Sequence, residues 1–291
     1  MTANLEIYQA SLTNEPFRPT NEDVEIVKLN MRANGTPIDP EYSPVNIFMI
    51  CDGHGGKKVA QAVAPYLAKK LCQKHLYYPL NNSIINGLYD NIQRKLEASK
   101  KQIANGCGTT ALVVLHYSIS HVKYVQIINI GDCRVVVSKD GVAMAWSKDH
   151  KPDWPDEKRR ITQVINQIGS KERIYFGAGA WRIGDLSVSR AFGDTDNLPF
   201  VTHRPDIFNH KLTSKCKFMI LACDGLWDVL SNEDAVNFIQ DHYTNNLLYT
   251  YSASQYNPSF RPGQNLAEKL AKYAIANGSE DNVSVIVVFF H

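Results

Sequence analysis

The chain contains, at residues 46–56, the stretch Asn46-Ile47-Phe48-Met49-Ile50-Cys51-Asp52-Gly53-His54-Gly55-Gly56. Its first six residues are mostly apolar, and such a run predicts a buried β-strand. The strand ends at the carboxylate of Asp52, and the glycines that follow allow the backbone to approach a ligand closely. A glycine-rich turn between a strand and a helix is the alternative. The imidazole of His54 is hard to explain by packing alone, and beside a metal-bridging carboxylate it favours proton donation to a leaving group.

Three further aspartates stand at the ends of similar apolar runs. Asp132 follows residues 124–131, Asp224 follows residues 218–223, and Asp281 precedes residues 283–290. Each alone is ordinary, because strands end at solvent. Together with Asp52 they predict carboxylates gathered at one rim of a sheet, where like charges raise one another's pKa values unless a cation neutralises them. Oxygen ligands favour Mg²⁺ or Mn²⁺.

Composition excludes several classes of protein. The 291 residues predict one large domain over 1–291, and 44% apolar with 21% charged residues is typical of a soluble globule. A net charge of +2 argues against a dedicated nucleic-acid or membrane surface. No apolar stretch approaches the ~18 residues of a membrane span. The cysteines form no Cys-x-x-Cys pair, so we expect core residues in a reducing compartment, cytosolic or nuclear, and neither disulfides nor zinc ligands.

Periodicity places helices and strands along the chain. Apolar residues recur every four positions at Val59, Val63, Leu67 and Leu71, which predicts a helix. Strands paired by hairpins, with helices following in pairs, predict an α+β fold. Residues 170–184 and 242–262 lack periodicity, and both are predicted to be surface loops, the second an insertion. Further helices are predicted at 85–96, 156–168 and 264–276, and strands at 110–117, 122–129 and 134–138.

Several short motifs accompany the four aspartates in a fixed order. They are Arg18-Pro19-Thr20-Asn21-Glu22-Asp23, Gly108-Thr109-Thr110-Ala111, Gly131-Asp132-Cys133-Arg134, Asp149-His150-Lys151-Pro152, Leu186-Ser187-Val188-Ser189-Arg190-Ala191-Phe192-Gly193-Asp194, Asp224-Gly225-Leu226-Trp227-Asp228 and Asp281-Asn282-Val283-Ser284. In this order and spacing they resemble the metal-dependent type-2C Ser/Thr protein phosphatases, the PPM family. The resemblance runs from about Arg18 to the end of the chain.

The resemblance implies a central antiparallel β-sandwich flanked by helical layers, with a metal cleft at one end. It also implies two Mg²⁺ or Mn²⁺ ions and a weaker third. Asp52 matches the ligand that bridges two ions, and Gly53 matches a carbonyl ligand. The other implied roles are as follows: Asp224 and Asp281 as ligands, Glu22 and Asp23 as acids that hold metal-bound waters, Asp132 and Asp228 at the weaker third site with Asp224, Arg18 as the phosphate-binding residue, and His54 as the general acid.

The activity expected from this resemblance is hydrolysis of phosphoserine and phosphothreonine in proteins by a metal-activated water. We expect a monomer, with residues 170–184 forming a flap where substrate selectivity varies. Two alternatives stay open: a catalytically silent pseudophosphatase that acts as a binding module, and a metal-dependent phosphodiesterase. From its own residues alone, a surface salt bridge is the better interpretation of Arg18.

Overall fold

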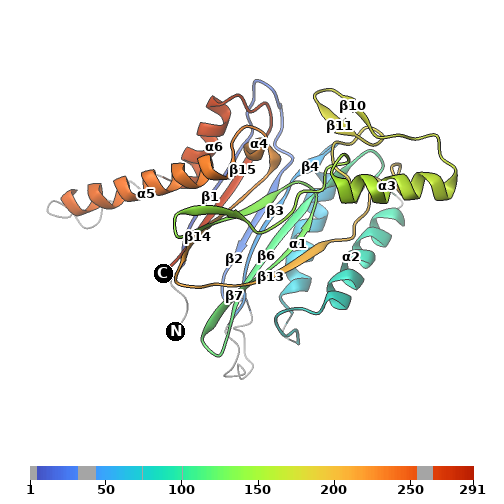
Figure 1. Cartoon of the computed structure of the whole chain (residues 1–291). Coiled ribbons are helices and arrows are strands. Elements are labelled where there is room, and N and C mark those ends of the chain that lie inside the picture. The colour runs from blue at the N-terminus through green and yellow to red at the C-terminus, as the bar shows by residue number, and fades with distance from the viewer. Residues whose placement is uncertain (1–4, 32–43, 74, 100, 254–264) are drawn as a thin grey trace. The chain divides into compact units, whose positions relative to one another are not determined.

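The computed structural model describes residues 5–31, 44–73, 75–99, 101–253 and 265–291. The chain divides into two compact units. Unit 1 comprises residues 1–21, 134–146 and 212–291, and unit 2 comprises residues 22–133 and 147–211. In its described residues, each unit contains one five-stranded antiparallel sheet with helices packed against it (Figure 1).

The sheet of unit 2 has the strand order β13-β7-β6-β3-β2. Its strands are β2 (Val24–Lys28), β3 (Asn46–Cys51), β6 (Ala111–Ile119), β7 (Val122–Ile130) and β13 (Asp206–Lys211). Every neighbouring pair is antiparallel, and in the centre Met49 of β3 pairs with Val113 of β6. Residues of β3 are buried along its whole length, which is why the strand carries the apolar run seen in the sequence.

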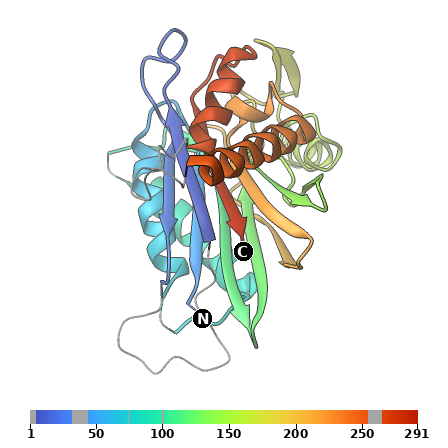
Figure 2. The ribbon, with the colours of Figure 1, turned by 90° about the vertical axis from the view of Figure 1, so that its left-hand side faces the viewer.

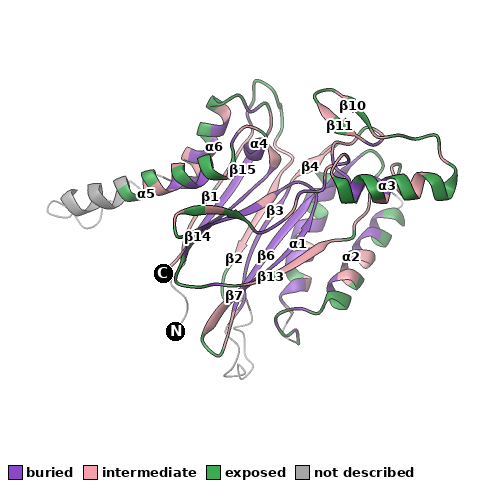
Figure 3. Cartoon of the chain, viewed as in Figure 1, coloured by how far each residue is buried: buried purple, intermediate pink, exposed green. Residues whose placement is uncertain are grey.

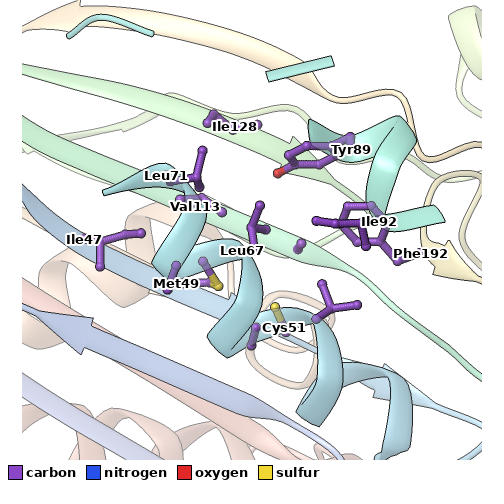
Figure 4. Close-up of a cluster of buried hydrophobic side chains, with 14 of the residues drawn as sticks. Ile47, Met49, Cys51, Leu67, Leu71, Tyr89, Ile92, Val113, Ile128 and Phe192 are labelled. Carbon is purple, nitrogen blue, oxygen red and sulfur yellow. The ribbon is translucent and has the colours of Figure 1, made fainter. Parts of the chain in front are cut away.

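Two helices cover this sheet and bury the core of unit 2. They are α1 (Lys58–Leu71) and α2 (Asn82–Glu97). Ile47 and Met49 of β3 lie close to Leu67 and Leu71 of α1, and none of the four side chains is exposed (Figure 4). Burying each such side chain stabilises the fold by about 1.5–3 kcal/mol. The four-residue spacing of α1 therefore predicted the correct helix, with its apolar face on the sheet.

The remainder of unit 2 contains a helix and short strands. These are α3 (Pro155–Ile168), a small sheet of β4 (Gly53–His54), β5 (Gly108–Thr109) and β12 (Phe192–Gly193), and a hairpin of β10 (Tyr175–Gly177) and β11 (Ala180–Arg182). The hairpin corrects the prediction of an irregular loop at 170–184. Its turn places Ala178 and Gly179 at φ values of 49° and 77°, the left-handed conformation that tight hairpin turns require.

The sheet of unit 1 has the strand order β1-β15-β14-β8-β9. Its strands are β1 (Leu5–Leu12), β8 (Arg134–Lys139), β9 (Val142–Ala145), β14 (Cys216–Ala222) and β15 (Val283–Phe290). The helices of unit 1 are α4 (Asp224–Trp227), α5 (Asn232–Ala253) and α6 (Leu266–Ala276). Strands β14 and β15 are buried almost throughout (Figure 3). The orange and red helices of Figure 2, α5 and α6, pack against this sheet through residues such as Ile239 and Leu270.

Helix α5 corrects the second loop prediction, at 242–262. The helix begins after Ser231, whose hydroxyl accepts a hydrogen bond from the Asp234 amide at 3.1 Å, while the Asp234 carboxylate accepts from the Ser231 amide at 3.2 Å. This reciprocal arrangement is that of a capping box. The helix then runs to Ala253 because no glycine or proline interrupts residues 232–253. Residues 254–262 of the predicted loop lie outside the described residues.

The α+β class with antiparallel sheets is confirmed. The six cysteines are unpaired by disulfides and buried, as predicted: Cys51, Cys72, Cys107, Cys133, Cys216 and Cys223. Among the described residues, no helix is both long and apolar enough to cross a membrane.

Candidate metal centre

Asp52 and Asp132 follow strands that flank the start of β6 in unit 2. The carbonyl of Asp52 accepts a hydrogen bond from the Thr110 amide at 2.9 Å, and the Asp52 amide donates to the Thr110 hydroxyl at 3.1 Å. On the other side of β6, Gly131 turns the chain with φ +97°, and a Cβ there would lie 2.4 Å from the Thr110 methyl carbon. Only glycine fits this position, and it brings Asp132 to the same edge of the sheet as Asp52.

Glu22 and Asp23 reach this edge from β2. Val24 pairs with Cys51, so the two acids lie beside the end of β3. The Glu22 carboxylate accepts a hydrogen bond from the Gly56 amide at 2.9 Å. A Cβ on Gly53 would stand 2.5 Å from the Glu22 carbonyl oxygen, so the two backbones can approach only because Gly53 lacks a side chain. We call Glu22, Asp23, Asp52 and Asp132 the unit 2 acid cluster.

The pKa values of neighbouring thiols report the charge of this cluster. Burial raises the pKa of Cys133 well above its ordinary value, and the charges of Asp52 and Asp132 raise it further. Cys51 behaves in the same way, with burial first and then the charges of Asp23 and Asp52. The carboxylates therefore add to the effect of burial, as expected where negative charges gather. Carboxylate and carbonyl oxygens with excess negative charge are the donor set of a hard divalent cation, so these residues fit Mg²⁺ or Mn²⁺.

His54 is held by Asp194, a residue to which the sequence analysis assigned no role. His54 Nε2 lies 2.9 and 2.8 Å from the two carboxylate oxygens of Asp194, which is 1% exposed. A Cβ on Gly108 would collide with both groups, at 2.1 Å from Asp194 Oδ2 and 2.5 Å from His54 Nε2. Burial lowers the pKa of His54, but the hydrogen bond and charge of Asp194, with the charges of Asp132 and Glu22, raise it above 6.5 overall.

Unit 1 brings Asp224, Asp228 and Asp281 together, and we call them the unit 1 acid cluster. Asp224 is the first residue of α4, and the Asp228 amide donates to its carbonyl at 2.8 Å, so the two acids are one helical turn apart. A Cβ on Gly225 would lie 2.0 Å from the Asn282 carbonyl oxygen and 3.4 Å from the Asp281 Cβ. The loops that carry Asp224 and Asp281 are therefore in contact.

Arg18 lies beside this second cluster. Its guanidinium contacts the Asp281 carboxylate at 2.7 Å, with 52% of the Arg18 side chain exposed. Asn14 fixes the loop, because its side chain donates to the carbonyls of Ser279 at 2.7 Å and Asp281 at 3.1 Å, while the Arg18 amide donates to its carbonyl at 3.1 Å. The predicted phosphate-binding residue is thus an exposed guanidinium next to a predicted metal ligand.

The placement of the acids corrects one expectation. The sequence predicted four aspartates at one rim of one sheet. Instead, Asp52 and Asp132 follow strands of the unit 2 sheet, whereas Asp224 comes after β14 and Asp281 precedes β15, two strands of the unit 1 sheet. Apolar runs show where strands end, but they do not show which sheet each strand joins. The aspartate behind His54 was missed for a similar reason, since 140 residues separate the two in sequence.

Comparison with known proteins identifies the family. The profile of protein phosphatase 2C matches residues 11–283. The chain belongs to the protein phosphatase 2C family. It therefore carries a protein serine/threonine phosphatase domain. A PP2C-like domain-containing protein of Acanthamoeba polyphaga mimivirus is 55% identical over 168 residues, which are 57% of this chain and 94% of the relative. A probable protein phosphatase 2C of Arabidopsis thaliana is 34% identical over 84% of this chain, and the match spans 62% of that relative.

Solved structures share the fold. A phosphatase from Toxoplasma gondii has a TM-score of 0.74 at 21% identity, covering 100% of this chain and 94% of its own. The structure of a C. elegans sex determining protein has a TM-score of 0.78 at 20% identity and covers 100% of this chain and 65% of its own. At these identities the likeness concerns the fold alone.

Proposed function

We propose that the chain hydrolyses phosphoserine and phosphothreonine in proteins with the help of two Mg²⁺ or Mn²⁺ ions and a weaker third. The single observation that carries this proposal is the unit 2 acid cluster at the end of β3, next to an imidazole aligned by a buried carboxylate. A cluster of like charges destabilises a fold unless it binds a cation. Its presence in a member of this family supports a working metal-dependent centre.

Each unit carries proposed ligands. Asp52, with the carbonyl of Gly53, is the proposed principal ligand in unit 2, and Asp224 and Asp281 are those in unit 1. Glu22, Asp23, Asp132 and Asp228 are proposed to complete the sites directly or through waters. Bound ions acidify water to a nucleophile at neutral pH and screen the phosphoryl oxygens. Uncatalysed phosphate-monoester hydrolysis is among the slowest of known reactions, so such charge neutralisation is needed.

The chain's own residues supply orientation and proton transfer. We propose that the exposed guanidinium of Arg18 binds the phosphoryl group, a role suited to its planar set of donors. His54 is proposed to give a proton to the departing serine or threonine oxygen. Asp194 contacts His54 Nε2 and so orients the ring. An alkoxide is a poor leaving group, which is why this proton matters.

The proposal includes a monomeric, single catalytic domain acting on phosphorylated proteins in the cytosol or nucleus. Two alternatives from other classes are a pseudophosphatase binding module and a metal-dependent phosphodiesterase. Hydrolysis of a phosphopeptide and of single-stranded DNA, each with and without Mn²⁺, separates the three. The proposal expects Mn²⁺-dependent release of phosphate from the peptide alone. Cleavage of DNA alone supports the phosphodiesterase, and binding of the phosphopeptide without turnover supports the pseudophosphatase.

A further inference from the structure

Lys151 contacts the most deeply buried acid of the unit 2 acid cluster. Its ammonium lies 2.9 Å from the Asp132 carboxylate, whose side chain is 1% exposed, while the Lys151 side chain is 24% exposed. A buried carboxylate needs a counter-charge, because water no longer solvates it. Lys151 supplies that counter-charge to Asp132, the residue that we assign to the weaker third metal site.

The backbone beside Asp132 is fixed from several directions. The Gly131 amide donates to Nδ1 of His150 at 3.1 Å, and the His150 amide donates to the Gly131 carbonyl at 3.0 Å. The side-chain amide of Asn129 donates to the carbonyls of Gly131 at 3.2 Å, Cys133 at 3.3 Å and Lys148 at 2.9 Å. The loop that carries Asp132 therefore has little freedom to turn away from Lys151.

His150 is itself anchored to β13, the strand next to β7 in the sheet. Its ring is fully buried, and Nε2 lies 3.1 Å from the Asp206 carboxylate at the start of β13. The His150 carbonyl accepts a hydrogen bond from the Ser189 amide at 2.9 Å. Since Lys151 follows His150 directly, the base of its side chain is fixed, whereas its ammonium is at the end of a flexible four-carbon chain. Lys151 is thus the mobile partner of the pair.

We propose that Lys151 is a built-in competitor of the third metal ion at Asp132. In the metal-free chain its ammonium neutralises Asp132, and a divalent cation must displace it to bind there. An ammonium and a divalent ion at one carboxylate repel each other, so the competition weakens the third site relative to the other two. This inference rests on the proposed function and adds a residue that sets the affinity of the third site.

Mn²⁺ titration of the purified chain, followed by the electron paramagnetic resonance signal of free Mn²⁺, tests the proposal. Lys151→Met keeps the aliphatic chain and removes the charge. It should tighten the weakest class of bound Mn²⁺ about tenfold, a change of about 1.4 kcal/mol. Asp132→Asn should abolish that class. Lys148→Met is the matched control, because Lys148 pairs with the exposed Asp156, and it should leave every class unchanged.

A second readout needs no metal. In EDTA, urea unfolding should show that Lys151→Met lowers stability in the wild-type background and lowers it far less in the Asp132→Asn background. Unchanged or weaker Mn²⁺ binding by Lys151→Met, with the other classes intact, overturns the competition alone. If the two substitutions change the free energy of unfolding additively, the ion pair between Lys151 and Asp132 does not contribute to stability, and the premise of the proposal is wrong. Absence of any Mn²⁺ binding by the wild-type chain overturns both this inference and the proposed function.

Discussion

Two groups of charged residues in unit 2 shift pKa values in opposite directions. Around Glu157, Arg190 donates to one carboxylate oxygen at 2.6 Å, and Arg160 and Ser189 donate to the other at 2.9 and 2.7 Å. Burial raises the pKa of Glu157, but the hydrogen bonds and charges of the two arginines outweigh it and lower this pKa to about 2. Near the unit 2 acid cluster, burial raises the pKa values of Cys133 and Cys51, and the charges of the cluster raise them further.

This difference distinguishes charged residues that stabilise the fold from those that bind a ligand. Arg190 also contacts Asp206 at 2.8 Å, and the hydrogen bond of His150 with the charge of Arg190 lowers the Asp206 pKa to about 2 despite burial. In this network each acid has cations fixed against it, so its role is to join α3, the segment at Arg190 and β13. The acid cluster has an excess of negative charge, which is a property of cation-binding sites.

The largest expected effect concerns the acid cluster. Asp52→Asn and Asp224→Ala should each lose nearly all phosphopeptide turnover at saturating Mn²⁺. Because each change removes one charge from a repulsive group, stability in EDTA should stay the same or rise. Turnover assays and urea unfolding measure the two quantities. Wild-type turnover in either variant would show that the residue is no ligand, and a large loss of stability would place Asp52 with the structural acids.

His54 allows a sharper test of chemistry at the same cluster. His54→Gln should slow phosphopeptide hydrolysis by about 10²–10⁴-fold, the usual contribution of general acid catalysis. The loss on p-nitrophenyl phosphate should be much smaller, because p-nitrophenolate leaves without a proton. Kinetics on both substrates, under conditions where chemistry limits the rate, measure the difference. Equal losses of rate on the two substrates would show that His54 positions metal ions or water and does not donate the proton.

Asp194 should act through His54. Asp194→Asn keeps the shape of the side chain but removes the charge next to His54 Nε2. We expect a smaller loss than for His54→Gln, again greater on the phosphopeptide than on p-nitrophenyl phosphate. The double variant measures whether the two residues act together, and it should be no slower than His54→Gln alone. Fully multiplicative losses would assign Asp194 a role independent of the imidazole.

The smallest effect on turnover, and the largest on stability, is expected in the ion-pair network of Glu157, Arg160 and Arg190. Glu157→Gln leaves two arginines without their carboxylate and should lower the free energy of unfolding at pH 7 by about 3 kcal/mol. The pKa of Glu157 is about 2 in the folded chain against an ordinary 4.5, so its stabilisation is present above about pH 5 and is lost as the pH falls towards 2. The gap between wild type and variant should narrow over that range.

The neighbouring Asp156 provides the control for this prediction. It pairs with Lys148 and Arg159 at the surface, and its side chain is 57% exposed. Asp156→Asn should change stability little, because solvent screens exposed ion pairs. Urea unfolding between pH 2 and 7 compares the two variants. Equal and small losses would mean that the Glu157 network is no more important to the fold than a surface pair.

Sequence reasoning located six of the ten strands in the two five-stranded sheets, and the acids at the ends of four of them. The apolar run before Asp52 and the four-residue spacing of Val59, Val63 and Leu67 follow from burial against a sheet, so pattern alone predicts them. Phosphatase membership followed from the ordered motifs. The flap at 170–184 was predicted as a loop because a hairpin of three-residue strands gives no periodic signal.

Contacts between residues that are distant in the sequence could not be predicted from the sequence. The partner of His54 is Asp194, 140 positions away, and Asp132 meets Lys151 after 19 positions. Neither spacing corresponds to a helix or strand period, so only the folded chain shows these pairs. The sequence likewise indicated that Arg18 binds phosphate or forms a surface salt bridge, but only the structure shows that its partner is Asp281.

The most direct test of the account is phosphate release from a phosphopeptide by the purified chain before and after metal removal. Thorough treatment with EDTA should abolish the activity, and Mn²⁺ or Mg²⁺ in excess should restore it, because the proposed ligands are oxygens that hold hard divalent cations. Asp52→Asn should stay inactive after the same addition. Undiminished hydrolysis by the fully chelated wild-type chain would contradict the assignment of the acid clusters to metal ions.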